Sequence, residues 1–136
     1  MPRVFVIIAT LFAAPTLAAE FQPIQSALLN EMVNGKNAYE TTKFTKCAAL
    51  AAATNSILAE AGENWTRDYD LQDMFRSAAH FLNEMGLYNS DTFSQDLYRF
   101  QDEYVDHMFM SKQSAGTVFS VIINNDFDFC EAALTE

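Results

Sequence analysis

Glycine and proline are scarce in this sequence, which limits the kinds of fold it can adopt. The 136 residues include only four glycines and three prolines. No Asn-Gly or Asp-Gly turn lies between two alternating apolar runs, which is the usual signal of a β-hairpin. Each glycine falls where an amphipathic pattern ends, the position that helices favour for glycine. The chain is therefore predicted to consist of helices with short connections.

Sequence signatures of catalysis and cofactor binding are absent. The chain has no Gly-x-x-x-x-Gly-Lys phosphate loop, no Gly-x-Ser-x-Gly nucleophile elbow and no Cys-x-x-Cys pair. It also lacks the Cys-x-x-Cys-His site of covalent haem. A triad assembled from distant residues would leave no such motif. We expect a protein without a cofactor and without enzymatic activity.

Positive charge is sparse, because eight Lys and Arg face 18 Asp and Glu for a formal net charge of −10. Such a surface repels nucleic acid and anionic lipid, so neither is an expected partner. Two interpretations of the acidity stay open. The charge suits a basic protein partner, or it only keeps the protein in solution.

Long hydrophobic runs are missing except at the N-terminus. Arg3 precedes an apolar run at residues 4–14, and Pro15, Ala18 and Ala19 follow it. This order is typical of a secretory signal peptide, and the run is too short to span a bilayer as a helix. We predict that residues 1–19 are cleaved and that residues 20–136 form one helical domain. The expected location is periplasmic or secreted, without stable membrane insertion.

Export determines how the two cysteines, Cys47 and Cys130, are interpreted. In an oxidising compartment, two cysteines of a small domain usually form a disulfide bond. A bond that closes so long a loop would stabilise the fold by roughly 4 kcal/mol in the chain-entropy model. We therefore predict a structural Cys47–Cys130 disulfide.

Apolar residues recur at intervals of three and four along most of the chain. The pattern predicts a short first helix and four main helices, at residues 24–34, 39–61, 70–85, 91–112 and 117–134. The central helix, residues 39–61, carries the alanine-rich run around Cys47. Asn37 and Glu40 are predicted to form its capping box, and Lys46 is predicted to face water. The short connection after residue 85 predicts that the next helix returns antiparallel. The fold class is all-α, a small bundle stapled by one disulfide.

The histidines are the strongest candidates for metal ligands. His80 has Glu84 four residues later, and His107 has Glu103 four residues earlier. In an antiparallel hairpin the two histidines would be offset by about 16 Å along the helices, too far to share an ion. Met108 and Met110 would point apart, and the Asp126 segment lacks the glycine of a calcium loop, so its acids are expected to stay solvated. We predict no metal site.

Aromatic side chains are more numerous than one core stripe per helix requires. Trp65 and Tyr69 are expected to pack at an end of the bundle. Four others lie off the stripes and are predicted to mark a partner surface: Phe81, Tyr98, Phe109 and Phe129.

These features favour a non-enzymatic binding or accessory protein whose protein partner and oligomeric state the sequence leaves open. One alternative is a periplasmic stress or acid chaperone, because low pH would neutralise many carboxylates. The other is a hydrolase or metal-dependent enzyme that uses His80 or His107 with a carboxylate.

Overall fold

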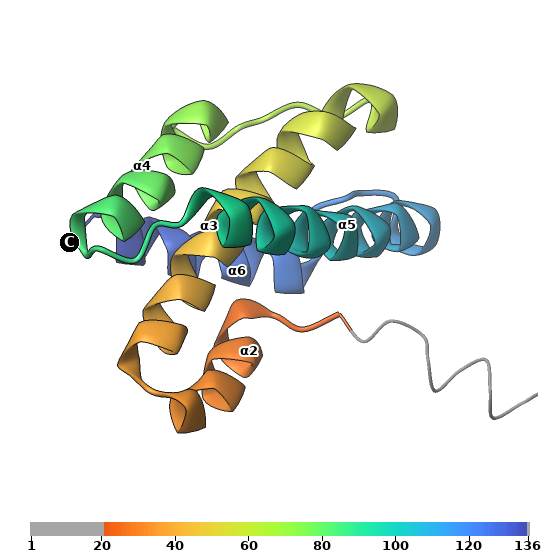
Figure 1. Ribbon diagram of the computed structural model, residues 1–136. Coiled ribbons are helices and arrows are strands. Elements are labelled where there is room, and N and C mark those ends of the chain that lie inside the picture. Colours follow the sequence, from red (N-terminus) through yellow and green to blue (C-terminus); the bar gives the residue numbers. More distant parts are fainter. Residues whose placement is uncertain (1–20, 136) are drawn as a thin grey trace, which may run out of the picture.

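A computed structural model describes residues 21–135 as a helical bundle without strands (Figure 1). The elements are α2 (Ile24–Glu31), the 3₁₀ helix η1 (Met32–Asn34), α3 (Lys36–Ala61), α4 (Leu71–Glu84), α5 (Ser90–Ala115) and α6 (Val121–Leu134). This confirms the all-α prediction. The predicted signal peptide, residues 1–19, lies outside the described residues.

Helix α3 is the centre of the molecule, and the other helices pack around it (Figure 1). From Phe44 to Thr54 every residue except Ala52 is buried. Small alanine side chains allow the neighbouring backbones to approach α3 from several sides. The helix therefore lacks the broad polar face that the sequence pattern predicted. The prediction that Lys46 faces water is wrong, since it is 1% exposed.

The N-terminal cap of α3 also differs from the prediction. The helix begins after Gly35, whose φ of 102° lies in the region that favours glycine. Asn37 lies inside the first turn and forms no cap, and Glu40 pairs with Lys43 instead. The chain reverses direction at Gly35, so the helix starts earlier than its apolar pattern. At the other end, Gly62 takes the predicted left-handed conformation.

Helix α4 begins at the predicted cap, because the Asp70 side chain accepts a hydrogen bond from the Gln72 amide. Helix α5 then returns past α4 as expected, but the two helices splay apart instead of packing along their lengths (Figure 1). The Phe75 and Phe93 rings, 6.1 Å apart, lie between them. Both helices pack mainly on α3, which explains the splay.

Helix α6 begins at Val121, later than the predicted start at residue 117. Ser120 caps it by accepting a hydrogen bond from the Ile123 amide. Residues 117–119 instead form a turn that is tied to the rest of the chain.

A disulfide between Cys47 and Cys130 joins α6 to α3, as predicted. The Cα atoms are 5.7 Å apart and both cysteines are fully buried. The bond therefore lies inside the core that α3 shares with α6.

Candidate functional site

A buried polar cluster lies where α3, α5, α6 and the start of α2 meet. The Asp126 carboxylate on α6 accepts a 2.7 Å hydrogen bond from the Tyr104 hydroxyl. It also accepts from the Ile24 amide, at 3.1 and 3.3 Å, and so caps the N-terminus of α2. Asp126 is 2% exposed, so the prediction that it stays solvated is wrong.

Lys46 on α3 completes this cluster. Its ammonium group donates a 2.9 Å hydrogen bond to the carbonyl of Gln22. It also lies over the rings of Phe100 and Tyr104, at 4.7 and 5.4 Å from their centroids. A carbonyl and two aromatic faces thus replace much of the water that a lysine needs.

Burial dominates the protonation of the cluster. Loss of water lowers the pKa of Lys46, although the charges of Glu103 and Asp126 act in the opposite direction. Burial also raises the pKa of Asp126, although hydrogen bonds from Tyr104 and Ile24 oppose it. The cluster is enclosed, so its polar groups link α2, α3, α5 and α6 through hydrogen bonds and charge interactions. They do not present reactive groups at the surface.

The two histidines lie in different environments. His107 lies beside the cluster, stacked on Phe21 at 4.3 Å and 3.0 Å from the Ser120 hydroxyl. Burial lowers its pKa. His80 is exposed and lies 3.3 Å from Glu84 on the next turn of α4. In the part of the chain that the structure describes, no three His, Cys, Asp or Glu side chains are arranged to hold a metal ion.

A second polar cluster fastens the turn before α6 to the end of α3. The Glu63 carboxylate accepts hydrogen bonds from Thr117, the Val118 amide and Lys112, at 2.6, 2.9 and 3.1 Å. Burial works against the charged form, but these three donors outweigh it and hold the pKa of Glu63 below its ordinary value.

The loop at residues 62–70 is held against α6 by Arg67. Its guanidinium donates to Asp128 at 3.0 Å and also to Glu131. Trp65 packs against Phe127, with ring centroids 4.9 Å apart. The loop is therefore part of the packed structure, in keeping with the prediction that Trp65 serves packing.

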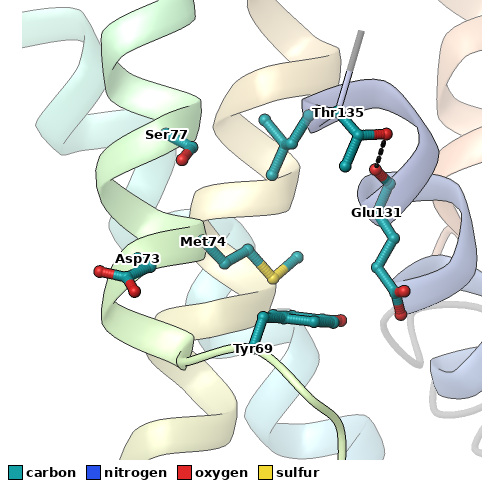
Figure 2. A pocket seen from close by; sticks show the side chains of 7 residues that line it. Tyr69, Asp73, Met74, Ser77, Glu131 and Thr135 are labelled. Atoms are coloured by element: carbon teal, nitrogen blue, oxygen red, sulfur yellow. Dashed lines mark hydrogen bonds between the residues drawn. The ribbon is translucent and has the colours of Figure 1, made fainter.

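A hollow of about 190 Å³ lies between α4 and α6, and Figure 2 shows the side chains that line it. Met74 and the Tyr69 ring project into the space between the helices, whereas Asp73 points to the far side of α4, where it pairs with Arg76. The Tyr69 hydroxyl is enclosed, with no hydrogen-bond partner in residues 21–135. The lining is mixed, with Met74 and Leu134 as apolar side chains and Asp73, Ser77, Glu131 and Thr135 as polar ones.

A wider hollow of about 380 Å³ lies beside α2, and we call it the α2 hollow. Its walls come from α2, η1, α3 and α6, and its lining residues are Gln25, Leu28, Leu29, Met32, Tyr39 and Phe129. Leu29, Met32 and Val33 stand exposed around it, and Val33 is 87% exposed. These three residues belong to the apolar pattern from which the helix at residues 24–34 was predicted. The last turn of α2 and η1 instead extend past the core.

The four predicted surface aromatics fall into two groups. Phe81 is stacked on Phe44 at 5.1 Å, and Phe129 lines the α2 hollow, so both are partly buried. Tyr98 and Phe109 are 65% and 43% exposed, and both lie on α5. Eleven residues make just over three helical turns, so these two share one side of the helix.

We call this side the outward face of α5. Besides Tyr98 and Phe109 it carries the exposed carboxylates Asp102 and Asp106, which have no ion-pair partner among residues 21–135. Helix α5 packs chiefly on α3 through its opposite side. In Figure 1, α5 lies in front of α3 and no described element covers its near side.

The sequence reasoning missed Lys46, Asp126 and Glu63 as polar anchors. A signal for Lys46 was present, since it directly precedes Cys47 in an alanine-rich run with little room for a polar face. Asp126 and Glu63 gave no comparable signal, because their donors lie far away in the sequence.

In comparisons with known proteins, the chain matches no family model, no curated protein and no solved structure.

Proposed function

We propose that this protein is an exported, non-enzymatic accessory protein that binds a basic protein partner through the outward face of α5. One observation carries the proposal. A single uncovered side of α5 presents two exposed aromatic rings, Tyr98 and Phe109, next to two carboxylates, Asp102 and Asp106, that have no ion-pair partner among residues 21–135. Aromatic rings supply contact area, and carboxylates attract and orient a basic partner.

The distribution of cations supports a basic partner. Five of the seven Lys and Arg side chains in residues 21–135 lie in ion pairs with carboxylates of the same chain. Lys46 is buried, so Lys36 is the remaining exposed cation in that part of the chain. Among residues 21–135 no cation is paired with Asp102 or Asp106, which leaves both carboxylates available to a basic partner.

The partner should contribute apolar side chains flanked by Lys or Arg, as an amphipathic basic helix does. Asp102 lies four residues after Tyr98, and Asp106 three residues before Phe109. A partner helix lying along α5 would meet one ring, two carboxylates and the second ring in turn. Its binding should weaken as salt rises, because exposed charges are screened.

The test places a photo-crosslinking residue at Tyr98 or at Phe109 of the mature protein in its native host. Tyr88 is the matched control, since it is an aromatic residue as exposed as Phe109. The proposal requires one partner with a basic segment to crosslink at both α5 positions and not at Tyr88.

Binding of that partner is then measured with Tyr98→Ser, Phe109→Ser and Tyr88→Ser. Each α5 variant should weaken binding at least tenfold, or about 1.4 kcal/mol, and Tyr88→Ser should leave it unchanged. Equal binding by all three variants would rule out the outward face as the partner site.

A second candidate function is an acid-activated chaperone, and a specific observation favours it. In the described chain, most side-chain hydrogen bonds between distant residues end on four carboxylates, Glu63, Asp126, Asp128 and Glu131. Below the ordinary carboxyl pKa, Glu63, Asp128 and Glu131 would lose their charge while the disulfide stays in place. Asp126 does not contribute to this effect, because burial raises its pKa and its protonation does not weaken the fold. The helices could then separate and expose apolar faces without the chain unfolding completely.

This candidate predicts binding of an apolar dye and protection of a client protein from aggregation at about pH 2–3, below the ordinary pKa of Asp and Glu. Glu131→Gln should shift the onset of dye binding to higher pH, whereas Glu60→Gln, an exposed residue of α3, should not. A protein that binds dye but protects no client is acid-sensitive without being a chaperone.

A further inference from the structure

The face around the α2 hollow combines a protruding apolar edge with an adjacent recess. Met32 and Val33 form the edge at η1, and Leu29 stands exposed one turn earlier on α2. The recess is lined by Leu28, Leu29, Met32, Tyr39 and Phe129 together with Gln25. Apolar side chains grouped beside a recess are typical of interaction sites.

An edge beside a recess is an arrangement that two copies can share by symmetry. In a two-fold dimer each copy offers the same surface to the other. The apolar edge of each copy would then lie against the recess of the other copy. Met32 of one copy can enter the recess of the other, and its own recess receives the second Met32. An unbranched thioether adapts readily to such an irregular recess.

Charge also favours a second copy at this face. Lys43 lies over the ring of Tyr39, which lines the hollow, and pairs with Glu40, while Glu31 and Lys36 both lie within four residues of Met32 in the sequence. Acidic and basic residues are therefore equal in number among these four. The rest of the described surface carries an excess of carboxylates, within a chain of net charge −10. Two identical acidic molecules repel each other in most orientations. The face around the α2 hollow is where two copies can approach with little electrostatic repulsion.

A strongly basic partner fits this face poorly. The two carboxylates near it are already engaged, Glu40 with Lys43 and Glu31 with Asn34 and Thr42. The surface therefore differs in chemistry from the outward face of α5. It is apolar and electrically neutral, whereas the α5 face is aromatic and acidic.

From this edge, recess and charge balance, we propose that the protein forms a two-fold dimer in which the α2–η1 edge of each copy occupies the α2 hollow of the other. The inference does not rest on the proposed function. It would place two outward faces of α5 in one assembly, which could then bind two basic segments at once.

The test is sedimentation equilibrium of the oxidised mature chain, from about 1 μM to 1 mM. The wild type should approach twice the mass of one chain as its concentration rises. Met32→Glu should weaken association at least tenfold, because each copy would bury a carboxylate in an apolar recess. Met110→Glu is the matched control, an exposed methionine on α5, and it should associate like the wild type.

A second measurement guards against a fold defect in Met32→Glu. A cysteine at Val33 should form an intermolecular disulfide under mild oxidation, whereas one at Val121, which is 76% exposed against 87% for Val33, should not. A protein that stays monomeric at all concentrations, or that dimerises equally well with Met32→Glu, would overturn the proposal.

The two proposals fail independently of each other. Tyr98→Ser and Phe109→Ser should keep the dimer and lose the basic partner. Met32→Glu should lose the dimer and still bind the partner, one copy to one segment. A partner that crosslinks at Val33 while the protein remains monomeric would assign the α2 hollow to that partner instead of a second copy.

Discussion

Lys46 and Asp126 are two ionisable residues that the fold holds almost entirely out of water. Removing each charge from water costs several kcal/mol before any partner is counted. The Gln22 carbonyl, two aromatic rings, the Tyr104 hydroxyl and the Ile24 amide offset that cost. The two residues also attract each other, so neither can be replaced without affecting the other.

Loss of either charge alone should be strongly destabilising. Lys46→Met or Asp126→Asn should each lower the free energy of unfolding by about 1–3 kcal/mol, since each removes an attracting charge from the other residue and leaves buried polar groups with fewer partners. The double variant should lose clearly less than the sum of the two. Urea unfolding at neutral pH measures all three, with the exposed Lys36→Met as control. Strict additivity would show that the two charges are not coupled.

Glu63 should make stability depend on pH. Its pKa in the folded chain lies below the ordinary 4.5, so the unfolded chain binds the proton more tightly. The stabilisation is fully present above pH 4.5 and is lost as the pH falls through the lower folded value. Asp126 acts in the opposite direction, because burial raises its pKa.

Glu63→Gln should therefore cost about 1–2 kcal/mol at pH 7 and progressively less below pH 4.5. Unfolding curves across this pH range provide the measurement, and the exposed Glu60→Gln is the control. A difference from wild type that stays constant down to pH 2 would assign the effect to shape instead of charge.

At the scale of elements, the alanines of α3 determine how closely the other helices approach. Ala48, Ala49 and Ala53 have no exposed surface, and the neighbouring helices all pack against α3. A larger side chain there has no free volume to enter, because protein interiors are closely packed.

Ala53→Leu should consequently destabilise the fold by about 1–3 kcal/mol through overpacking. Ala59→Leu, which adds the same side chain at an exposed position of the same helix, should change stability by less than about 0.5 kcal/mol. Thermal and urea unfolding of the two variants compare them directly. Similar losses in both would mean that α3 is packed less tightly than the burial of its alanines indicates.

The sequence predicted the helices better than it predicted their environment. Apolar periodicity and the cap at Asp70 identified every main helix, because these signals are local in the sequence. It failed at Lys46 and at the start of α6 because each depends on a residue distant in the chain, Gln22 for Lys46 and Glu63 for the turn before α6. The cap of α3 was missed for a local reason, since Gly35 starts the helix two residues before Asn37.

The candidate surfaces were predicted only in part, for a related reason. A residue off the core stripe is exposed only if no second helix covers it. Tyr98 and Phe109 satisfy this condition, whereas Phe81 packs on Phe44 of α3 and Phe129 lies beside α2. Leu29 and Met32 show the reverse case, since an apolar stripe can extend beyond the helices that would cover it.

At the scale of the whole molecule, the disulfide and the packing of the core both hold α6 against α3. The bond closes a loop between residues that are 83 positions apart. Replacing both Cys47 and Cys130 by alanine should lower the free energy of unfolding by about 4 kcal/mol, mainly by enlarging the unfolded ensemble. Urea unfolding measures the loss, and reduced wild type should behave like the variant. A loss below about 1 kcal/mol would mean that helix packing alone fixes α6 on α3.

The same bond divides the chain into a covalent ring and two tails. The ring runs from Cys47 to Cys130 and contains half of α3, all of α4 and α5, and most of α6. A force applied to the two ends of the chain passes through the disulfide and leaves α4 and α5 unloaded. The N-terminal tail carries α2 and the first turns of α3, and its contacts with α4, α5 and α6 resist pulling. A machine that threads this protein must therefore either reduce the bond or pass a doubled chain through its pore.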